Sequence, residues 1–190
     1  MSGEELVRRL LEGEKRFVGI DLEEGFDLAG DAHFDKIQTA LKARDIQDLK
    51  ENPVILNHSN LRYIKADGLY FPCAICVATN FAGASLRGAI LWGADFRGAY
   101  FGGADLANAN LSEADIHGAR FWGADFRAAD LRCVKNLEKA LHLENANYLG
   151  TKVTKKQEDY LSDLLKRKVM FIVDREERTY FPLPLIRGET

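Results

Sequence analysis

Cysteine and histidine are the residue types in this chain that could support catalysis or bind a metal ion. Cys73 and Cys76 are separated by two residues, a spacing found in redox dithiols and in one half of many zinc sites. The sequence has no second pair of this kind, and Cys133 is the only other cysteine. His117 lies close to Asp115, and such a pair could move a proton or contribute to a metal site. What these residues can do depends on the element that positions them.

The segment around these residues repeats with a period of five from Leu69 to Arg132. Every fifth position holds an apolar side chain or a cysteine, which we call the centre, and 13 centres follow one another without an insertion. Two residues before the centre, 11 of the 13 positions are alanine, and the residue between them is often Asp or Asn. Two residues after the centre, glycine is frequent. So long and regular a pattern indicates one repetitive fold.

A period of five fits neither regular element. An α-helix advances about 100° per residue, so centres five residues apart would be spread around it and would form no stripe. A strand alternates its faces with a period of two, so an odd period would place successive centres on opposite faces. A chain that takes a short extended step and then turns a corner does fit. The alanine and the centre then point inward, the Asp or Asn points outward, and glycine allows the bend.

These residues resemble the repeats of the pentapeptide-repeat family. The resemblance implies a mainly β fold, a right-handed quadrilateral β-helix with four repeats per coil. Residues 20 apart then lie above one another, about 4.8 Å apart. The centres form four apolar core columns: Phe71, Leu91, Leu111 and Leu131; Cys76, Phe96 and Ile116; Phe81, Phe101 and Phe121; Leu86, Leu106 and Phe126.

Three parts of the chain are expected. Residues 1–52 read as an N-terminal helical cap, residues 53–134 as the β-helix, and residues 135–190 as a C-terminal cap. A solenoid needs such caps because its ends expose core side chains and unpaired strand edges.

The N-terminal cap is expected to contain two helices. Residues 3–13 have apolar residues on one face and a capping box of Ser2 and Glu5. Residues 34–50 show apolar residues at helical spacing. Between them, residues 17–22 look like two degenerate repeats.

The C-terminal cap is expected to be a helix followed by a β-hairpin. Thr154 and Gln157 form a second capping box at the start of the helix. The β-branched and aromatic residues at 169–173 and 179–181 flank a polar turn, which favours a hairpin.

The repeat register weakens the chemical interpretation of the cysteines and the histidine. Cys76 is a centre and points inward, whereas Cys73 lies at a corner, and Cys133 lies three coils away, about 14 Å. His117, with Asp95 and its neighbours, lies on a convex and solvated wall. We therefore expect no catalytic residue, no metal site, no cofactor and no enzymatic activity.

Composition excludes several classes of protein. The chain of 190 residues is 46% apolar and 29% charged, so it can bury a core. Its net charge of -3 is not that of a nucleic-acid-binding protein. No apolar run is long enough to span a membrane, and the first residues lack the apolar region of a secretory signal. Three cysteines fit a reducing compartment, so we expect a cytoplasmic location and neither a nucleic-acid nor a membrane partner.

The aspartates raise an alternative, because some pentapeptide-repeat proteins confer quinolone resistance by binding DNA gyrase with a rod that imitates duplex DNA. Duplex DNA carries one charge per ~1.7 Å, so an imitation about 20 Å long needs about 12 uncompensated negative charges. Residues 53–134 carry seven acidic and seven basic side chains. The arginines that interleave with the acids and balance them are Arg87, Arg97, Arg120, Arg127 and Arg132. A gyrase-binding protein therefore stays the alternative.

Apolar residues at outward positions suggest interaction surfaces. Tyr70, Ile90 and Trp92 belong to an apolar patch that either a flank or a partner covers. Tyr100 and Trp122 lie on the opposite face, where no flank needs them, and aromatic residues anchor interfaces. We expect a protein-interaction or scaffold module, with a homodimer as one possible assembly.

Overall fold

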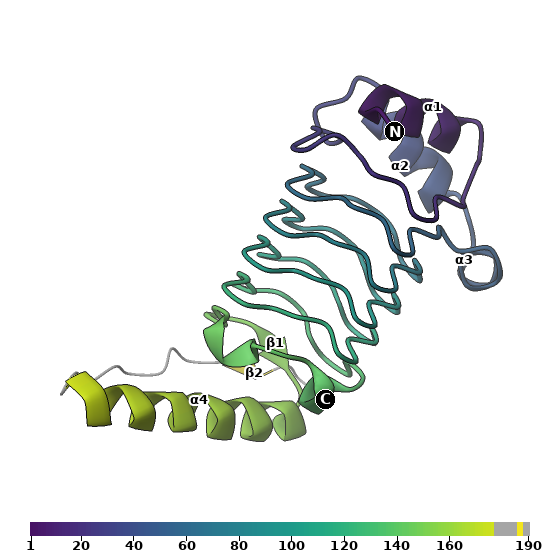
Figure 1. Ribbon diagram of the computed structural model, residues 1–190. Helices are drawn as coiled ribbons and strands as arrows, with labels where there is room; N and C mark the ends of the chain where they lie inside the picture. The colour runs from purple at the N-terminus through teal and green to yellow at the C-terminus, as the bar shows by residue number, and fades with distance from the viewer. Residues whose placement is uncertain (177–185, 188–190) are drawn as a thin grey trace.

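The computed structural model describes residues 1–176 and 186–187 (Figure 1). Their main body is a β-helix whose layers are joined by parallel bridges between residues 20 apart, as the period of five predicts. We call this body the rod and name its four sides by their bridged residues. Side A holds Ile75, Asp95 and Asp115; side B holds Asn80, Tyr100 and Arg120; side C holds Ser85, Asp105 and Asp125; side D holds Tyr70, Ile90 and Asn110.

The backbone of each layer is hydrogen-bonded to the layers on both sides of it. The N–H of the centre Phe81 donates to the carbonyl of Tyr100 at 2.7 Å, and the N–H of Tyr100 donates back to the carbonyl of Thr79 at 2.9 Å. At the corner, the N–H of Ala84 donates to the carbonyl of Phe81 at 3.0 Å. The same pattern recurs along the rod, so its buried polar backbone is satisfied between layers.

The inside of the rod is filled by the alanines and the centres, as predicted from the sequence. Phe81, Phe101 and Phe121 stack with their rings 5.0 and 5.3 Å apart and 7° from parallel. Phe126 extends a second column by stacking on Tyr148 at 5.6 Å. The four predicted columns are buried throughout, so they form one continuous core.

The rod is longer than the range 53–134 expected for it. At its start, Arg16, Asp21 and Asp27 form bridges to residues 55, 60 and 65, so residues 16–27 make three sides of an additional layer. The degenerate repeats at 17–22 belong to this layer. At the other end, bridges continue as far as Lys152. There the spacing widens because the 3-10 turns η1 (Leu137–Lys139) and η2 (Leu143–Asn145) are inserted.

The N-terminal cap consists of α1 (Gly3–Leu11), α2 (Phe34–Lys42) and α3 (Ile46–Glu51). The Ser2 side chain accepts a hydrogen bond from the Glu5 N–H, which confirms the predicted start of the first helix. The helix predicted at 34–50 is two helices. Asp45 adopts an extended conformation and its side chain caps α3 by accepting from the N–H of Asp48, and an N-cap residue does not continue a preceding helix.

Helix α2 replaces the missing fourth side of the first layer. In the other layers, the outward N–H on side D donates to a carbonyl of the preceding layer. The N–H of Tyr70 has no such layer before it and donates instead to Oε1 of Gln38 at 2.7 Å. The Gln38 side chain is buried, so it satisfies a backbone donor that would otherwise lie unpaired at the end of the rod.

The C-terminal cap is α4 (Lys155–Glu176), which lies across the end of the rod in Figure 1. Thr154 and Gln157 form the predicted capping box. The hairpin prediction is wrong for residues 169–173, because α4 runs through them. Lys166, Arg167 and Lys168 precede them, and no Gly, Pro or Asn is present to end a helix already formed. The second predicted strand, 179–181, lies outside the described residues.

The last layer is extended on side D by a short parallel strand. Strand β1 (Lys152–Val153) pairs with β2 (Ile186–Arg187). Because Lys152 also bridges Asp130, β2 continues the side D ladder beyond the last layer.

Candidate interaction surface

The cysteines occupy the positions that the repeat register predicts. Cys76 is buried in the core, and burial raises the pKa of its thiol well above its usual range. Cys73 lies at a corner, where partial burial raises its pKa more modestly. Neither thiol is activated for nucleophilic or redox chemistry, since both shifts favour the protonated form.

His117 lies on side A and its surroundings do not assemble a site. Its backbone N–H donates to Oδ1 of Asp115 at 3.0 Å, and Asn136 donates to the same oxygen at 2.8 Å. Asp95 is bound by Arg97 at 2.7 Å. Within the described residues, no group of three His, Cys, Asp or Glu side chains is arranged to hold a metal ion.

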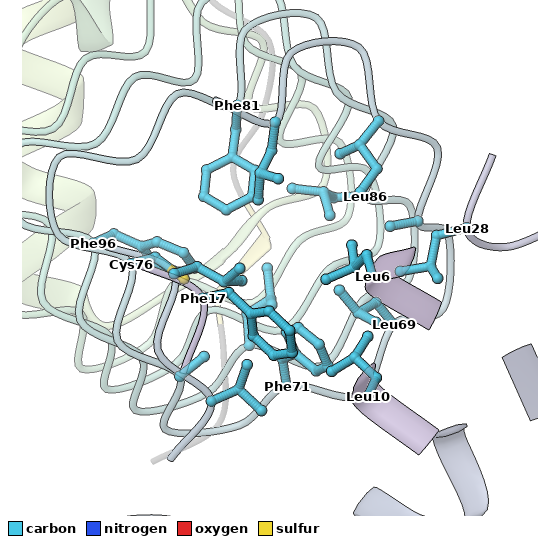
Figure 2. Close-up of a pocket in the computed structure, with 17 residues that line it drawn as sticks. Leu6, Leu10, Phe17, Leu28, Leu69, Phe71, Cys76, Phe81, Leu86 and Phe96 are labelled. Carbon is cyan, nitrogen blue, oxygen red and sulfur yellow. The ribbon is translucent and has the colours of Figure 1, made fainter. Parts of the chain in front are cut away.

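An apolar gap of about 30 Å³ lies inside the rod near α1 (Figure 2). Its lining is wholly apolar and includes Leu6 of α1 and the small side chains of Ala66 and Cys76. Ala66 occupies a centre position where Leu86 stands one layer further on. The gap lies where a small residue stands in a column of large ones, and its volume is far below that of a small-molecule site.

A shallow depression of about 660 Å³ lies where α4 meets the end of the rod. It is lined by the exposed Cys133 together with Glu138, Lys156 and Tyr160 among others. No histidine is among these lining residues.

Sides A, C and D share an arrangement that neutralises their acids. On each of them an outward aspartate is bound by an arginine two residues along the chain or on the preceding layer. The pairs are Asp95 with Arg97, Asp105 with Arg87, Asp125 with Arg127 and Asp130 with Arg132, at 2.7 to 2.9 Å. Four outward aspartates on these sides are consequently compensated, whereas Asp115 on side A is bound by the neutral amide of Asn136 and the N–H of His117.

The pairing also shifts pKa values in the expected directions. Hydrogen bonds to Asp95 and Asp125 raise the pKa of Arg97 and of Arg127. Burial works to raise the pKa of Asp130, but hydrogen bonds from the side chain and N–H of Arg132 outweigh it, so that pKa is lowered. The Asp130 carboxylate is thus held ionised and compensated at neutral pH.

Side B is different because its middle layers carry arginine without acid. The stretches 58–63, 78–83, 98–103 and 118–123 contain no Asp or Glu, whereas the first layer of this side holds Asp21, Glu23 and Glu24. In the described part of the chain, Arg120 makes no ion pair and no side-chain hydrogen bond. Arg120 is therefore a cation without an acidic contact on this wall.

Arg62, the other cation of side B, is held against an aromatic ring. Its guanidinium lies 5.2 Å from the centroid of the Tyr63 ring and donates to the Tyr63 hydroxyl at 3.4 Å. Glu24 attracts it from beyond ion-pair distance. Arg62 is therefore positioned on the wall with its charge uncompensated by a contact.

Large apolar side chains are exposed on the same wall. Their exposed fractions are 43% for Tyr63, 38% for Tyr100, 60% for Trp122 and 44% for Leu141. All four lie on side B or on the corner that ends it. Exposed apolar residues scattered singly need no explanation, but a group on one wall is typical of an interaction surface.

Two glycines allow the tyrosines to lie along the wall. A β-carbon at Gly83 would lie 2.3 Å from Cε1 of Tyr63, and one at Gly102 would lie 2.6 Å from the hydroxyl of Tyr100. The rings therefore lie over the glycines and do not project far from side B. Such a surface suits contact with another chain.

The sequence of the rod matches the pentapeptide repeats, in eight copies, over residues 74–112 and 94–132. Residues 74–132 are pentapeptide repeats. The family resemblance predicted from the sequence is therefore confirmed. No curated protein matches the chain.

Solved structures similar to this chain include pentapeptide-repeat proteins. One from the thylakoid lumen of Arabidopsis thaliana is 24% identical, over 55% of this chain and 72% of its own, with a TM-score of 0.29. One from the cyanobacterium Cyanothece 51142 is 24% identical, over 80% and 97%, with a TM-score of 0.23. QnrB1, a plasmid-mediated fluoroquinolone resistance protein, is 15% identical, over 80% and 87%, with a TM-score of 0.27. Such values carry no argument about function.

The pentapeptide-repeat rod places the five residues singled out from the sequence on two opposite sides. Tyr100 and Trp122 are exposed on side B. Tyr70, Ile90 and Trp92 are half-buried on side D. Lys42 of α2 lies 5.9 Å from the centroid of the Tyr70 ring, and Gln38 binds the Tyr70 backbone. The N-terminal cap therefore occupies the start of the side D patch, and side B is the open candidate surface.

Sequence analysis missed that Arg120 has no acidic contact. Arg120 was counted among the arginines that balance the acids, and this was wrong, because it faces none of them. A signal was present: Arg97, Arg127 and Arg132 each follow an Asp by two residues, whereas residue 118 is a glycine and residue 60 an asparagine. Tyr63 and Leu141 were also missed, since Tyr63 stands at a corner position and Leu141 lies beyond the strict repeat.

Proposed function

We propose that this chain is a non-enzymatic protein-interaction module that binds a partner protein along side B of its rod. The observation that carries the proposal is the group of exposed apolar side chains on one wall, with Trp122 at 60% exposure. Aromatic residues and arginine are the side chains that most often anchor protein interfaces. Side B carries both, and its backbone is held rigid by hydrogen bonds to the layers on either side.

The chemistry of the described residues favours a binding role over an enzymatic one. Burial raises the pKa of the Cys76 thiol, and partial burial raises that of Cys73. Four outward aspartates of the rod are paired with arginine. An enzyme needs a nucleophile or base placed at an enclosed site, whereas side B is a convex wall.

The alternative is a gyrase-binding protein that imitates duplex DNA, as the family resemblance suggests. Such a protein needs uncompensated negative charge along its rod. Arginine pairing of the aspartates on sides A, C and D works against that. Ionic strength separates the two functions: binding of gyrase by charge imitation weakens steeply with added salt, and binding through apolar anchors does not.

The proposal is tested by substituting both aromatic anchors. The variant Tyr100→Ser with Trp122→Ser should fail to capture the partner that the unchanged protein captures from cells of its source. Leu149→Ser is the matched control, because Leu149 is 42% exposed but lies on side C. Capture that survives the double substitution, or that is lost with Leu149→Ser alone, would contradict a partner site on side B.

A further inference from the structure

Each corner of the regular layers has a backbone N–H that takes no part in the bonds between layers. It belongs to the residue two positions after the outward bridged residue, and an Asp or Asn oxygen accepts from it at most corners. On side A, Oδ1 of Asp95 accepts from the N–H of Arg97 at 3.1 Å. On side B, Oδ1 of Asn80 accepts from the N–H of Ala82 at 3.0 Å. These corner N–H groups are therefore donors that a side-chain oxygen fits.

Side B leaves two neighbouring corner donors open. Tyr100 and Arg120 occupy the positions on the next two layers that correspond to Asn80. In the described part of the chain, the N–H groups of Gly102 and Trp122 make no hydrogen bond. Two adjacent layers of this wall therefore lack the side-chain acceptor that their corners would otherwise have.

An isolated open corner also occurs on side D. The N–H of Trp92 makes no hydrogen bond within the described residues, but on the next layer the N–H of Ser112 donates to Oδ1 of Asn110 at 2.9 Å. The open pair on side B is therefore a different arrangement, because its two donors lie on successive layers.

The open pair on side B is close enough to bind one group. Neighbouring layers are about 4.8 Å apart, so the two oxygens of one carboxylate can accept from both N–H groups at about 2.9 Å. The Tyr100 hydroxyl lies beside Gly102, where a β-carbon would be 2.6 Å from it. Arg120 makes no ion pair in the part of the chain that the structure describes. This corner therefore gathers four donors, and the stretches 98–103 and 118–123 that form it contain no carboxylate.

Elsewhere on the rod, a corner N–H and a guanidinium together bind one carboxylate. Asp95 accepts from the N–H and the Nε of Arg97 at 3.1 and 2.8 Å. Asp130 accepts from the N–H and the Nε of Arg132 at 3.1 and 3.0 Å. Hydrogen bonds between charged groups are stronger than neutral ones. The open corner of side B has both kinds of donor, so a carboxylate from another chain fits it.

The acidic residues of side B itself lie too far away to occupy this corner. Asp21, Glu23 and Glu24 belong to the first layer, and Tyr100 lies three layers further along the rod, about 14 Å. Exposed charges so far apart are largely screened, since the Debye length is about 8 Å at physiological ionic strength. These acids therefore neither bind the open donors nor strongly repel an anion there.

We propose that side B binds a side-chain carboxylate of its partner protein at the corner formed by Gly102 and Trp122. This inference rests on the proposed function and specifies what the partner presents. The carboxylate accepts from the two open N–H groups and pairs with Arg120. The partner residues beside it lie against the exposed Trp122 ring, which removes apolar surface from water.

Nuclear magnetic resonance of the full-length protein tests the site with short peptides. The probe is acetyl-Leu-Asp-Leu-amide. One control has Asn in place of Asp, and the other is acetyl-Leu-Ser-Leu with a free carboxyl end. The probe should move the amide protons of Gly102 and Trp122 downfield, because they gain a hydrogen bond, and leave that of Ala82 unchanged, because Asn80 already binds it. It should bind about tenfold more tightly than the Asn control.

Several outcomes of this titration would overturn the inference. Equal binding of the Asn control is one, and unchanged amide protons at Gly102 and Trp122 with the probe at millimolar concentration are another. Tighter binding of the free carboxyl end or of inorganic phosphate is a third, since it would assign the donors to a different anion.

Two neutral substitutions at one position separate the guanidinium from the N–H groups. Arg120→Gln removes the charge and should weaken probe binding about tenfold. Arg120→Asn also removes the charge, but the introduced side chain has the length with which Asn80 caps Ala82. It should occupy the N–H of Trp122 and weaken the probe about fivefold further. Equal binding by the two variants would overturn the site, and Arg127→Gln on side C is the control that should change nothing.

The same variants separate failure of the inference from failure of the proposed function. Partner capture that depends on Tyr100 and Trp122 but is unchanged by Arg120→Asn would overturn the carboxylate site and leave the interaction module standing. Capture that does not depend on the aromatic residues either would overturn both.

Discussion

Sides B and C of the rod have the same backbone and core but present different surfaces to solvent. On side C, Arg87 and Arg127 bind Asp105 and Asp125. On side B the corresponding layers carry Tyr100 and Arg120 without any acid. The repeat fixes which positions face outward, and it leaves the residues at those positions free. Function in such a rod is therefore found by comparing its sides, since the fold itself is common to all four.

The largest expected effect separates aromatic residues inside the rod from those on side B. Phe101→Ala should lower the free energy of unfolding by about 3–5 kcal/mol, because Phe101 is fully buried between two stacked rings. Trp122→Ala should change it by less than about 1 kcal/mol, since Trp122 is mostly exposed. Chemical denaturation of the two variants measures the difference. A large loss with Trp122→Ala would mean that side B is a structural surface.

A smaller loss of stability is expected at the start of side D, where the first layer of the rod has no fourth side. Gln38→Leu leaves the N–H of Tyr70 without its acceptor, and a buried donor left unpaired costs about 1–3 kcal/mol. Gln38→Glu retains an acceptor oxygen and is the matched comparison for this hydrogen bond. Thermal unfolding of both variants gives the result. Equal stability of Gln38→Leu and the unchanged protein would show that the N–H of Tyr70 needs no acceptor at this end of the rod.

Acid titration sharpens the contrast between paired and unpaired charges. The pKa of Asp130 in the folded protein is lowered, so its contribution to stability is present above its unfolded pKa near 4 and is lost as the pH falls through the folded value. The stability difference between the unchanged protein and Asp130→Asn should therefore shrink below about pH 4. The difference made by Arg120→Gln should not follow that titration, because Arg120 makes no ion pair in the described part of the chain. A parallel loss for both variants would mean that Arg120 has an acidic partner.

The smallest effect is expected from the outer charges at neutral pH. Arg127→Gln and Arg120→Gln should both leave the melting temperature unchanged within the precision of calorimetry, because exposed ion pairs contribute little to stability. A clearly lower melting temperature of Arg120→Gln would show that Arg120 stabilises the fold. It would count against Arg120 being available to a partner.

The sequence predicts the inside of this protein better than its outside. Centres such as Phe81 and Phe101 recur every five residues, so their columns follow from the period alone. The extra layer at residues 16–27 was visible only as degenerate repeats, since helices α2 and α3 interrupt it. The helix through residues 169–173 was missed because β propensity is a weak guide beside a helix that nothing terminates.

The candidate surface was predictable in part. Tyr100 and Trp122 stood out as aromatic residues at outward positions, and both are exposed. The shared contribution of Tyr63, Arg62 and Leu141 depends on contacts across layers, such as the Tyr63 ring over Gly83. Position in the repeat does not specify such contacts.

Photo-crosslinking at defined positions tests the central claim most directly. Benzoylphenylalanine is placed at Trp122 on side B or at Leu149 on side C, both exposed in the structure, and the protein is irradiated inside the cells that produce it. We expect a specific crosslinked protein from position 122 and none from position 149. The same product from both positions, or a product from position 149 alone, would contradict the assignment of side B as the interaction surface.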